Sequence, residues 1–379
     1  MGRSPEVPPR SDPHTSRRTH QVVIDSLIPS ATPGARSRPV AIGRVLIGGP
    51  DTPVISGPCA VEPGYVGHAL AAARAGASVL RGCVYKPRTQ PEAFQGMGAA
   101  GLELLDEARH LTGLPVIAEP LQTEHVVQLQ PHVDALMIGA RSMHNTPLLR
   151  AAARSGLPVI VKRGISATID EWLAAARYVL LEGNDQVVLC ERGIRTFEPA
   201  TRNTLDISSI PVLRDRTELP VIVDPSHAAG HASWVPALAM AAVAAGADGL
   251  LIESHPDPEH ALCDSAQAIT PAALAEIVRA TQLLVTSARP VPMTTVSQCR
   301  TAIDGVDTAL AQLLERRATL VARVERIKLD SGAPIRDRRR EAEVTERVAL
   351  LAPQLGHAGA TAVMTAVIDA CIATALARA

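Results

Sequence analysis

The tetrapeptide Leu-Pro-Val-Ile occurs three times in this chain, at residues 114–117, 157–160 and 219–222. Each copy runs within a few residues into a charged side chain, namely Glu119, Lys162 and Asp224. A second unit, Ala-Gly-Ala followed by Ser or Asp, begins at Ala75 and again at Ala245. Short apolar runs that recur in this way, each followed by an Ala- and Leu-rich stretch, indicate a repeated strand–helix unit.

The alternation continues from about residue 53 to about residue 288 and predicts eight strands. They are expected at 54–57, 78–84, 116–119, 135–139, 159–162, 187–190, 221–224 and 249–253. Eight strand–helix units in this length are typical of a (β/α)8 TIM barrel. A doubly wound sheet is disfavoured because no G-x-G-x-x-G sequence follows the first strand. The predicted fold class is therefore α/β.

The regions outside this alternation have other compositions. Residues 1–38 are rich in Pro, Ser and Arg, which predicts a disordered N-terminal tail. Residues 40–42 and 45–47 predict a short hairpin that caps the bottom of the barrel, so the barrel domain is expected at 39–288. Residues 289–295 contain a Pro-rich break and are expected to be a linker, followed by an all-helical domain at 296–379.

Composition excludes several classes of protein. The 379 residues carry a net charge of −1, so nothing argues for a nucleic-acid partner. No apolar run is expected to approach a membrane span, and Arg and Pro stand where a signal peptide needs an apolar core. The six cysteines are scattered without a C-x-x-C pair, which favours reduced thiols. We predict a cytoplasmic protein without a membrane partner.

Charged side chains gather just after the predicted strands, where a TIM barrel carries its chemistry. The set is Cys59, Arg81, Lys86, Arg88, Glu119, Arg141, Lys162, Glu191, Arg192, Arg195, His227, Glu253, His255 and Asp264. Its densest part is Arg81–Pro91, RGCVYKPRTQP. Because Arg and Lys recognise phosphate and carboxylate, and one phosphate needs fewer cations than this, we expect two phosphorylated substrates, at least one with a carboxylate. The alternative is a set of rim ion pairs with Glu62, Glu92 and Glu191.

Four members of the set could hold a metal. Cys59, His227, Glu253 and Asp264 offer one sulfur, one nitrogen and two carboxylates, which suits a divalent ion such as Mn²⁺, Fe²⁺, Co²⁺ or Zn²⁺. No sequence spacing announces such a site. His227 could equally cap a turn, and Cys59 could be a packing residue.

Residues 54–270 resemble the 3-deoxy-D-arabino-heptulosonate 7-phosphate (DAHP) synthases of the short-barrel microbial subfamily. The matching segments are GPCAVE from Gly57, KPRT from Lys86, FQGMG from Phe94, IGARSMHN from Ile138, VKRG from Val161, CERGIRTFEPATRNTLDIS from Cys190, VDPSHAAG from Val223 and IESHPDP from Ile252. The long run from Cys190 is highly specific.

The resemblance implies a transferase that condenses phosphoenolpyruvate (PEP) with erythrose 4-phosphate in the first step of the shikimate pathway. It implies a metal on Cys59, His227, Glu253 and Asp264. It implies that PEP is held by Arg81, Lys86, Arg141, Lys162 and Arg192, and erythrose 4-phosphate by Lys86, Arg88 and Thr89. The catalytic residues would be Lys86, Lys162, Glu119 and His227, with Glu119 or Lys162 positioning or deprotonating the attacking water.

Two alternatives stay open. A synthase of the eight-carbon sugar acid Kdo 8-phosphate shares the barrel but lacks KPRT. A non-catalytic regulatory subunit would have a degraded barrel, which the intact set of polar residues disfavours.

The last domain begins with a very long predicted helix. Its apolar residues follow a three-four spacing: Val296, Cys299, Ile303, Val306, Leu310, Leu313, Leu320, Val324 and Ile327. Arg317 interrupts this seam, and Lys328 lies three turns further along the same face. A cation in an apolar seam is unfavourable unless an anion meets it, although a coiled-coil helix with one snorkelling Arg would look the same.

Residues 296–379 resemble the all-helical chorismate mutases, on CRTAIDGVD from Cys299, LLERR from Leu313, RIK from Arg326 and PIRDRRRE from Pro334. The resemblance implies a three-helix domain, a homo-oligomer formed through the helical domain and the barrel, and a site for chorismate or prephenate. That site would be formed by Arg300 (reaching into a partner subunit), Arg317, Lys328, Asp337, Arg340 and Glu341.

The sequence departs from this pattern on the last helix. Where such enzymes usually offer a Ser and, four residues later, a Gln or Glu, the chain has Cys371 and Ala375. Ala cannot donate a hydrogen bond to the ether oxygen of chorismate, and losing one such donor typically lowers the rate about 10²-fold or more. We therefore expect weak mutase activity, or a domain that senses chorismate or prephenate as a feedback signal.

Overall fold

The computed structural model describes residues 37–88, 90–288 and 295–377. The chain divides into two compact units, residues 1–288 and 289–379, and each is described by itself. Almost all of the predicted tail and linker lies outside the described residues.

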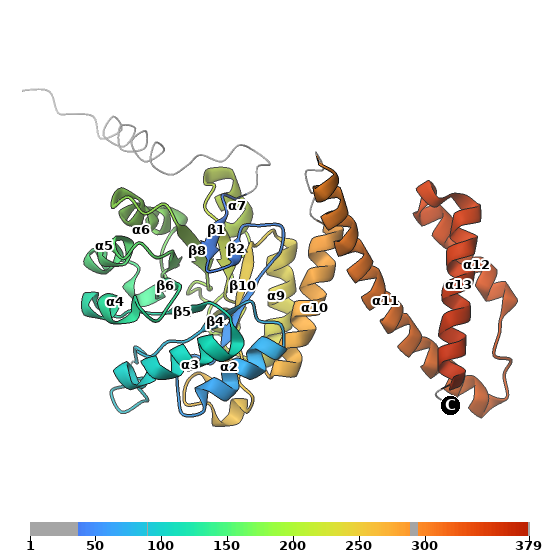
Figure 1. Ribbon diagram of the computed structural model, residues 1–379, viewed down its shortest axis with the longest axis horizontal. Helices are drawn as coiled ribbons and strands as arrows, with labels where there is room; N and C mark the ends of the chain where they lie inside the picture. Colours follow the sequence, from blue (N-terminus) through green and yellow to red (C-terminus); the bar gives the residue numbers. More distant parts are fainter. Residues whose placement is uncertain (1–36, 89, 289–294, 378–379) are drawn as a thin grey trace, which may run out of the picture. The chain divides into compact units, whose positions relative to one another are not determined.

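The first unit is a closed barrel of eight parallel strands, which confirms the predicted fold class (Figure 1). The strands, in their order around the barrel, are β3 (Val54–Gly57), β4 (Val79–Arg81), β5 (Val116–Ala118), β6 (Ala135–Ile138), β7 (Val159–Lys162), β8 (Val187–Glu191), β9 (Val221–Val223) and β10 (Gly249–Glu253), which pairs with β3. Every predicted strand is present. The prediction for β4 was too long, because the chain leaves the sheet after Arg81 and the carbonyl of Cys83 accepts a hydrogen bond from Val61 in a neighbouring loop.

Helices separate the strands along the chain. They are α2 (Tyr65–Arg74), α3 (Leu102–Thr112), α4 (Thr123–Leu129), α5 (Thr146–Arg154), α6 (Ile169–Leu181), α7 (Ser209–Arg216), α8 (Pro225–Ala229), α9 (Val235–Ala244) and α10 (Pro271–Ala288). Short 3₁₀ turns complete the unit: η1 (Gly98–Gly101), η2 (Ala140–Ser142), η3 (Ala232–Trp234), η4 (Pro258–His260) and η5 (Ser265–Gln267).

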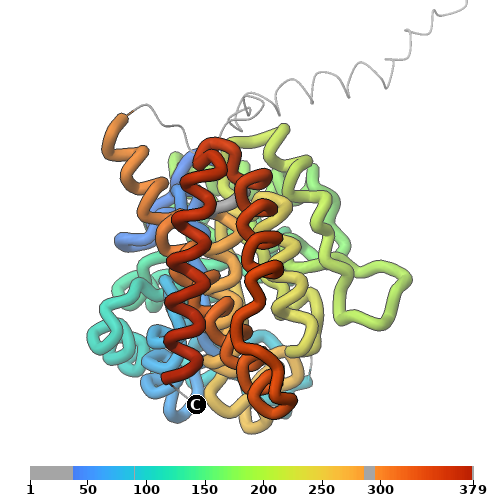
Figure 2. Tube along the Cα trace, turned by 90° about the vertical axis from the view of Figure 1, so that its right-hand side faces the viewer, coloured from blue at the N-terminus to red at the C-terminus, as the bar shows by residue number. Residues whose placement is uncertain are grey.

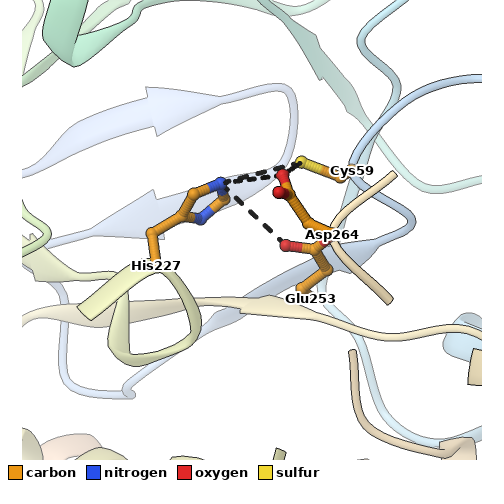
Figure 3. Close-up of side chains that lie close together, drawn as sticks. All are labelled: Cys59, His227, Glu253 and Asp264. Carbon is orange, nitrogen blue, oxygen red and sulfur yellow. Dashed lines mark hydrogen bonds and ion pairs between the residues drawn. The ribbon is translucent and has the colours of Figure 1, made fainter. Parts of the chain in front are cut away.

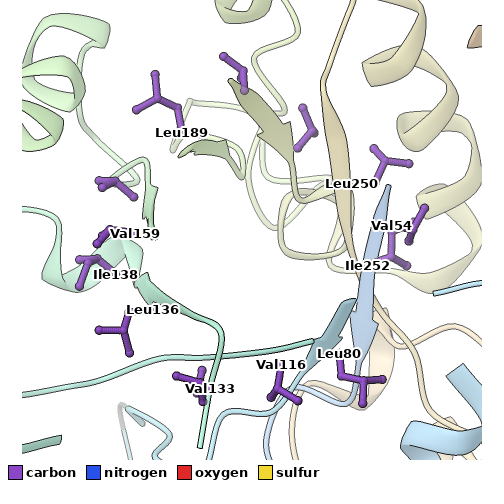
Figure 4. Close-up of a cluster of buried hydrophobic side chains, with 14 of the residues drawn as sticks. Val54, Leu80, Val116, Val133, Leu136, Ile138, Val159, Leu189, Leu250 and Ile252 are labelled. Carbon is purple, nitrogen blue, oxygen red and sulfur yellow. The ribbon is translucent and has the colours of Figure 1, made fainter. Parts of the chain in front are cut away.

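Alternate residues along each strand build two cores. Residues such as Val54, Leu80 and Leu136 face the helices and form the outer core (Figure 4). Their neighbours Ile55 and Met137 belong to a second buried cluster, which also contains apolar residues of the other strands. This alternation follows from the period-two geometry of a strand, and it leaves the strand ends free to carry polar side chains.

The hairpin of β1 (Val40–Ile42) and β2 (Val45–Ile47) closes the bottom of the barrel, as predicted. Ile42 and Ile47 are fully buried in the same cluster as Ile55. The turn at Gly43 lies against Pro115, just before β5, which places the hairpin at the N-terminal ends of the strands. The opposite end of the barrel is thereby the end that is open to substrate.

The second unit contains α11 (Val296–Ser331), α12 (Arg338–Leu351), η6 (Pro353–Leu355) and α13 (Gly356–Ala377). Thr295 and Gln298 form a capping box at the start of α11, and Gly332 ends the helix in a left-handed conformation. α12 and α13 run side by side, joined at one end by η6 (Figure 2). The very long helix expected from the sequence is α11, which has 36 residues.

The segment 353–377 corrects one expectation from composition. It has a mean hydropathy of 1.8 over its most apolar window and is long enough to cross a membrane, although only 22% of that window is buried in this chain. This assignment rests on length and composition alone, and the core helix of a soluble protein meets the same criteria. α13 contacts both α11 and α12, which accounts for part of its apolar character.

Candidate functional site

Four side chains converge at the C-terminal end of the barrel (Figure 3). Cys59 follows β3, His227 lies on α8, Glu253 ends β10, and Asp264 lies between η4 and η5. Each offers a ligand atom, and these atoms lie within 4.8 Å of one another. The sulfur of Cys59 is 3.0 Å from Asp264 Oδ2 and 3.6 Å from His227 Nε2. His227 Nε2 is also 3.9 Å from the nearest carboxylate oxygens of Glu253 and Asp264. We call this group the tetrad.

The tetrad fits a divalent cation. Glu253 Oε1 is buried and has no hydrogen-bond partner among the described residues. Burial raises the pKa of Glu253 and that of the Cys59 thiol, because it disfavours their anionic forms. A cation would compensate these buried charges, and one thiolate, one imidazole and two carboxylates suit a first-row transition ion.

Asp224, fully buried just after β9, orients the histidine of the tetrad. His227 Nδ1 lies 2.8 Å from Asp224 Oδ2, and the His227 main-chain N–H donates to Oδ1 at 2.9 Å. Burial lowers the pKa of His227 well below its usual value, so the ring is neutral. With Nδ1 turned to the carboxylate, Nε2 faces the tetrad, as a metal-binding histidine requires.

Asp224 also pairs with Lys162 Nζ. Burial acts to raise the pKa of Asp224, but the Lys162 cation and the hydrogen bond from the His227 main-chain N–H outweigh it and hold that pKa well below its usual value. One ionised carboxylate therefore holds a residue of the tetrad and a cation predicted to bind substrate.

A cavity of about 790 Å³ opens beside the tetrad. Cations line much of its wall: Lys86, Arg88, Arg141, Lys162, Arg192, Arg195 and Arg202. His227 and Asp264 also line it, so the tetrad and the cations face one space. A cavity with this charge selects anionic ligands.

Lys86 joins the two parts of the site. Its Nζ lies 3.3 Å from Asp264 Oδ2 and contacts the sulfur of Cys59. Burial acts to raise the pKa of Asp264, but the Lys86 cation outweighs it, and the pKa falls below its usual range.

Arg81 lies behind the cavity wall and does not line the cavity. It is only 1% exposed, donates to the carbonyls of Gly57 and Pro58 at 3.1 Å, and lies 3.5 Å from Glu253 Oε2. Its role with PEP stays a prediction, while its contacts support Glu253. Thr89 lies outside the described residues.

Glu119 reaches the cavity wall because the residue beside it, directly after the next strand, is a glycine. A Cβ atom at Gly139 would lie 1.9 Å from Glu119 Oε1. Gly139 therefore leaves the space that the Glu119 carboxylate occupies.

A buried network holds Glu191 and Gly193, the residues on either side of Arg192. Arg163 Nη1 donates to Glu191 and to Asp206, each at 2.8 Å, and the Gly193 N–H donates to Glu191 Oε1 at 2.6 Å. Glu191 thus pairs with Arg163, and Glu62 lies 2.7 Å from His255. Neither glutamate forms the rim ion pair with a cavity cation that the alternative interpretation required.

Sequence reasoning misplaced Arg81, Glu191 and His255, which do not line the cavity, and it missed other residues. His255 follows β10 as expected but is buried against Glu62 and does not line the cavity. Arg202 and Asn203 line the cavity although they are far along the chain from the end of β8. Arg202 lies 3.2 Å from Asp264 Oδ1 and donates to Gln267 at 2.7 Å. Arg202 could have been predicted as a cation of the specific segment that begins at Cys190, but it does not directly follow a strand.

In the helical unit, the predicted ligands of chorismate have local partners. Asp337 caps α12 by accepting from the Arg340 N–H at 3.0 Å, and both oxygens of Glu341 accept from Arg336 at 2.9 Å. Lys328 Nζ donates to the carbonyl of Ile335.

Two further predicted residues lie on α11, and the two positions that depart from the mutase pattern lie on α13. Arg317 Nη1 donates to the Val367 carbonyl at 3.4 Å. Arg300 is exposed and precedes Arg317 by about 25 Å along the helix, so the two do not meet in one chain. Cys371 and Ala375 are buried on α13.

Two family descriptions match the chain. The first is "DAHP synthetase I family", over residues 30–287, and the second is "Chorismate mutase type II", over residues 299–375.

Known proteins agree with the first match. The chain is 45% identical over 234 residues to a phospho-2-dehydro-3-deoxyheptonate aldolase of Thermotoga maritima, covering 61% of this chain and 69% of that protein. It is 36% identical over 238 residues to a 2-dehydro-3-deoxyphosphooctonate aldolase of Syntrophotalea carbinolica, covering 57% and 84%.

Solved structures extend the likeness to the fold. The crystal structure of the phospho-2-dehydro-3-deoxyheptonate aldolase (DAHP synthase) of Thermotoga maritima matches with a TM-score of 0.65 and 41% identity, over 68% of this chain and 76% of that one. A truncated form of the Thermotoga maritima 3-deoxy-D-arabino-heptulosonate 7-phosphate synthase matches with a TM-score of 0.64 and 38% identity, over 70% and 97%.

Proposed function

The chain belongs to the DAHP synthetase I family and carries a chorismate mutase type II domain after the barrel, and we propose that the barrel condenses PEP with erythrose 4-phosphate to form DAHP and inorganic phosphate. The observation that carries this proposal is a tetrad suited to a metal at the wall of a cation-lined cavity. The eight-carbon alternative is less well supported, because the octonate aldolases are 33–36% identical and the heptonate aldolase is 45% identical.

The cations divide between the two substrates. We assign Arg141, Lys162 and Arg192 to the phosphate and carboxylate of PEP, with Lys86 between the two substrates. Arg88 and Thr89 are assigned to the phosphate of erythrose 4-phosphate. These cations line one cavity beside the tetrad, which supports two anionic substrates bound next to each other. Thr89 lies outside the described residues.

A divalent metal is proposed at Cys59, His227, Glu253 and Asp264, with Mn²⁺, Fe²⁺, Co²⁺ and Zn²⁺ as the candidates. When bound, such an ion would polarise the aldehyde oxygen of erythrose 4-phosphate. The protein's part is to hold the sugar phosphate and PEP so that the two carbons meet.

The reaction joins C3 of PEP to the aldehyde carbon, and the aldehyde oxygen takes up a proton to become a hydroxyl. A water adds its oxygen to C2 of PEP, and the bond between C2 and the phosphate oxygen breaks. Of the two protons of the water, one balances the proton on the new hydroxyl and the other leaves with the phosphate. Arg141, Lys162 and Arg192 would stabilise charge on the phosphate and carboxylate throughout. Because Lys162 is paired with Asp224, it is suited to act as a cation, and this supports Glu119 as the group that takes the proton of the water.

The test is phosphate release from PEP with and without erythrose 4-phosphate. Release that requires both substrates, stops with a chelator and returns with Mn²⁺ is the expected result. Release with arabinose 5-phosphate in place of erythrose 4-phosphate would establish the eight-carbon alternative. Absence of release under every condition would support a regulatory subunit.

For the helical unit we propose weak chorismate mutase activity or binding of chorismate or prephenate as a feedback signal. Ala375 supports this because it offers no side-chain donor, and Arg336 already occupies both oxygens of Glu341. Prephenate formation by the full chain that is much slower than DAHP formation is the expected result, because losing one such donor lowers the mutase rate about 10²-fold or more. Comparable turnover for the two reactions would contradict it.

A homo-oligomer is proposed through α11. The seam residues Ile303, Leu310, Leu313, Leu320 and Ile327 are 50–67% exposed in one chain. A row of this kind at three-four spacing is the face that a second α-helix covers. We propose that a second copy covers it, which would also bring Arg300 of each chain to its partner.

A further inference from the structure

A second buried cluster lies beside the tetrad and has no place in the proposed reaction. It consists of Glu62 in the loop after β3, His68 on α2 and His255 after β10. Glu62 and His255 are each about 4% exposed. The Oε1 atom of Glu62 is 2.7 Å from His255 Nε2 and 3.9 Å from His68 Nδ1. The two imidazole rings meet edge to face, with centroids 4.2 Å apart.

The hydrogen bonds of His255 argue that this cluster is not a second metal site. The main-chain N–H of Asp257 donates to His255 Nδ1 at 3.0 Å, so this nitrogen carries no proton. The proton of the neutral ring is then on Nε2, which donates it to Glu62. A nitrogen that donates a hydrogen bond has no lone pair for a metal. His227 of the tetrad has the opposite arrangement, with Nδ1 turned to the carboxylate of Asp224 and Nε2 turned to the other tetrad residues.

The second oxygen of Glu62 holds a different loop. Oε2 accepts the main-chain N–H of Leu262 at 3.0 Å. Leu262 is two residues before Asp264, which has a φ of 51° and is the non-glycine residue with positive φ among the described residues. A left-handed Asp needs support from its surroundings, and a fixed Leu262 N–H supplies such support at the start of the bend.

Glu62 therefore links the three segments that carry Cys59, Glu253 and Asp264. It belongs to the first segment, and its carboxylate contacts the other two through His255 and Leu262. Cys59 lies three residues before Glu62 in the same loop. Glu253 lies two residues before His255, and Asp264 lies two residues after Leu262. Only His227, which Asp224 orients, reaches the tetrad without this contact.

We propose that Glu62 is a positioning residue that holds Cys59, Glu253 and Asp264 at ligand distance before the metal arrives. Hydrogen bonds to an ionised carboxylate are stronger than neutral ones, and a buried carboxylate with two donors fixes both. Without it, the loops of Cys59 and Asp264 would need to be ordered by the metal, and the affinity for the metal would fall. This inference rests on the metal site proposed above but not on the identity of the reaction.

The direct test is Glu62→Gln. The amide keeps the size of the side chain, but its NH2 group would face either His255 Nε2–H or the Leu262 N–H. Both of these groups are donors, so one of the two hydrogen bonds would be lost. We expect the Kd for Co²⁺, measured by competition with a chromophoric chelator, to rise about 10–100-fold. Two further readouts do not depend on activity. The thiolate-to-Co²⁺ absorption band should change, and the Leu262 amide of the metal-free protein should exchange its hydrogen faster.

The matched control is Asp248→Asn at the other end of the barrel. Asp248 is 3% exposed, and its Oδ2 accepts from the Val221 N–H at 2.8 Å and from the Ser37 hydroxyl at 2.9 Å. This variant should lose stability and keep the wild-type Kd for Co²⁺. An equal loss of affinity in both variants would assign the effect to general destabilisation and overturn the proposal.

The other outcomes are equally decisive. Wild-type affinity in Glu62→Gln overturns the proposal while leaving the metal site intact, and two equivalents of Co²⁺ in the wild-type protein would make the cluster a metal site instead. A wild-type protein that binds no metal refutes the proposed tetrad itself. If Glu62→Gln does not fold, His255→Asn, whose shorter side chain falls short of Glu62, should still weaken Co²⁺ binding, and an unchanged Kd there also overturns the proposal.

Discussion

The barrel pairs its buried charged groups within one chain, whereas the helical unit leaves an apolar surface exposed. In the barrel, buried charges have partners: Asp224 with Lys162, Glu191 with Arg163, and Arg81 with Glu253. In the helical unit, the apolar seam of α11 is exposed along its length in one chain. Eight strand ends can surround a site within one chain, whereas three helices leave one face uncovered. We infer that the barrel site is complete in a single copy and that the helical site is not.

Metal removal should separate the two units most strongly. Treatment with a chelator should lower DAHP formation about 10³-fold or more, because the proposed Lewis acid supplies several kcal/mol to the barrier. Prephenate formation, if present, should not change, since the tetrad lies wholly in the barrel. Coupled assays of the same sample, before and after adding Mn²⁺, measure both. Full DAHP formation by metal-free protein would remove the metal from the barrel.

Asp224→Asn tests whether one carboxylate serves both halves of the barrel site. The variant leaves Lys162 without its buried anion and His227 without its orienting carboxylate. We expect about 10²-fold lower kcat/KM, because outer carboxylates on metal-binding histidines contribute 10–100-fold and the loss of Lys162's partner adds to it. Both the KM for PEP and the Kd for Co²⁺ should rise.

The control is Asp134→Asn, which also removes a carboxylate that accepts a main-chain N–H, from Val116 at 2.8 Å. A change confined to one of the two readouts in Asp224→Asn would show that Asp224 serves only one half of the site.

Gly139→Ala should have a smaller effect on the same reaction. The added methyl group would displace the Glu119 carboxylate, and a shift of about 1 Å in a catalytic group lowers turnover up to about 10²-fold. The affinity for Co²⁺ should stay at the wild-type value. Gly67→Ala is the control, because Gly67 lies on α2 with nothing within 4 Å of its Cβ position. Wild-type kcat in Gly139→Ala would exclude Glu119 as the group that takes the proton.

Sequence reasoning predicted the barrel well because its signals are local. A short apolar run and the turn after it occupy adjacent residues, so each strand could be placed from its own segment. The end of β4 was the exception. The strand stops early because the Cys83 carbonyl accepts a hydrogen bond from Val61, which lies in a loop more than 20 residues away along the chain.

The site was predictable only as far as strand ends determine it. Cys59, His227 and Glu253 follow strands, and their type suggested a metal. The position of Arg202 depends on how a long loop returns to the barrel mouth, which no spacing encodes. Glu62 lies only five residues after β3, but its contacts depend on where His255 and Leu262 lie. His255 shows the same limit, since its distance from β10 does not reveal that it turns towards Glu62.

Leu310→Glu should leave the barrel almost unchanged and disrupt the helical unit's assembly. Leu310 is 50% exposed in the seam of α11, and a carboxylate there would be buried against a second copy without a partner. The wild-type protein should sediment as an oligomer, and the variant should dissociate. Its DAHP formation should stay within about twofold of wild type, because the tetrad and the cavity are formed by residues of the barrel alone.

Thr308→Glu is the matched control for this comparison. Thr308 is exposed and lies two residues from Leu310, on the side of α11 away from the seam, so the same added charge should not change sedimentation. Prephenate formation should fall in Leu310→Glu and not in Thr308→Glu, because Arg300 would lose its partner chain. If Leu310→Glu instead kept the wild-type sedimentation, the exposed seam would not be the interface, and the helical site would have to be completed within one chain.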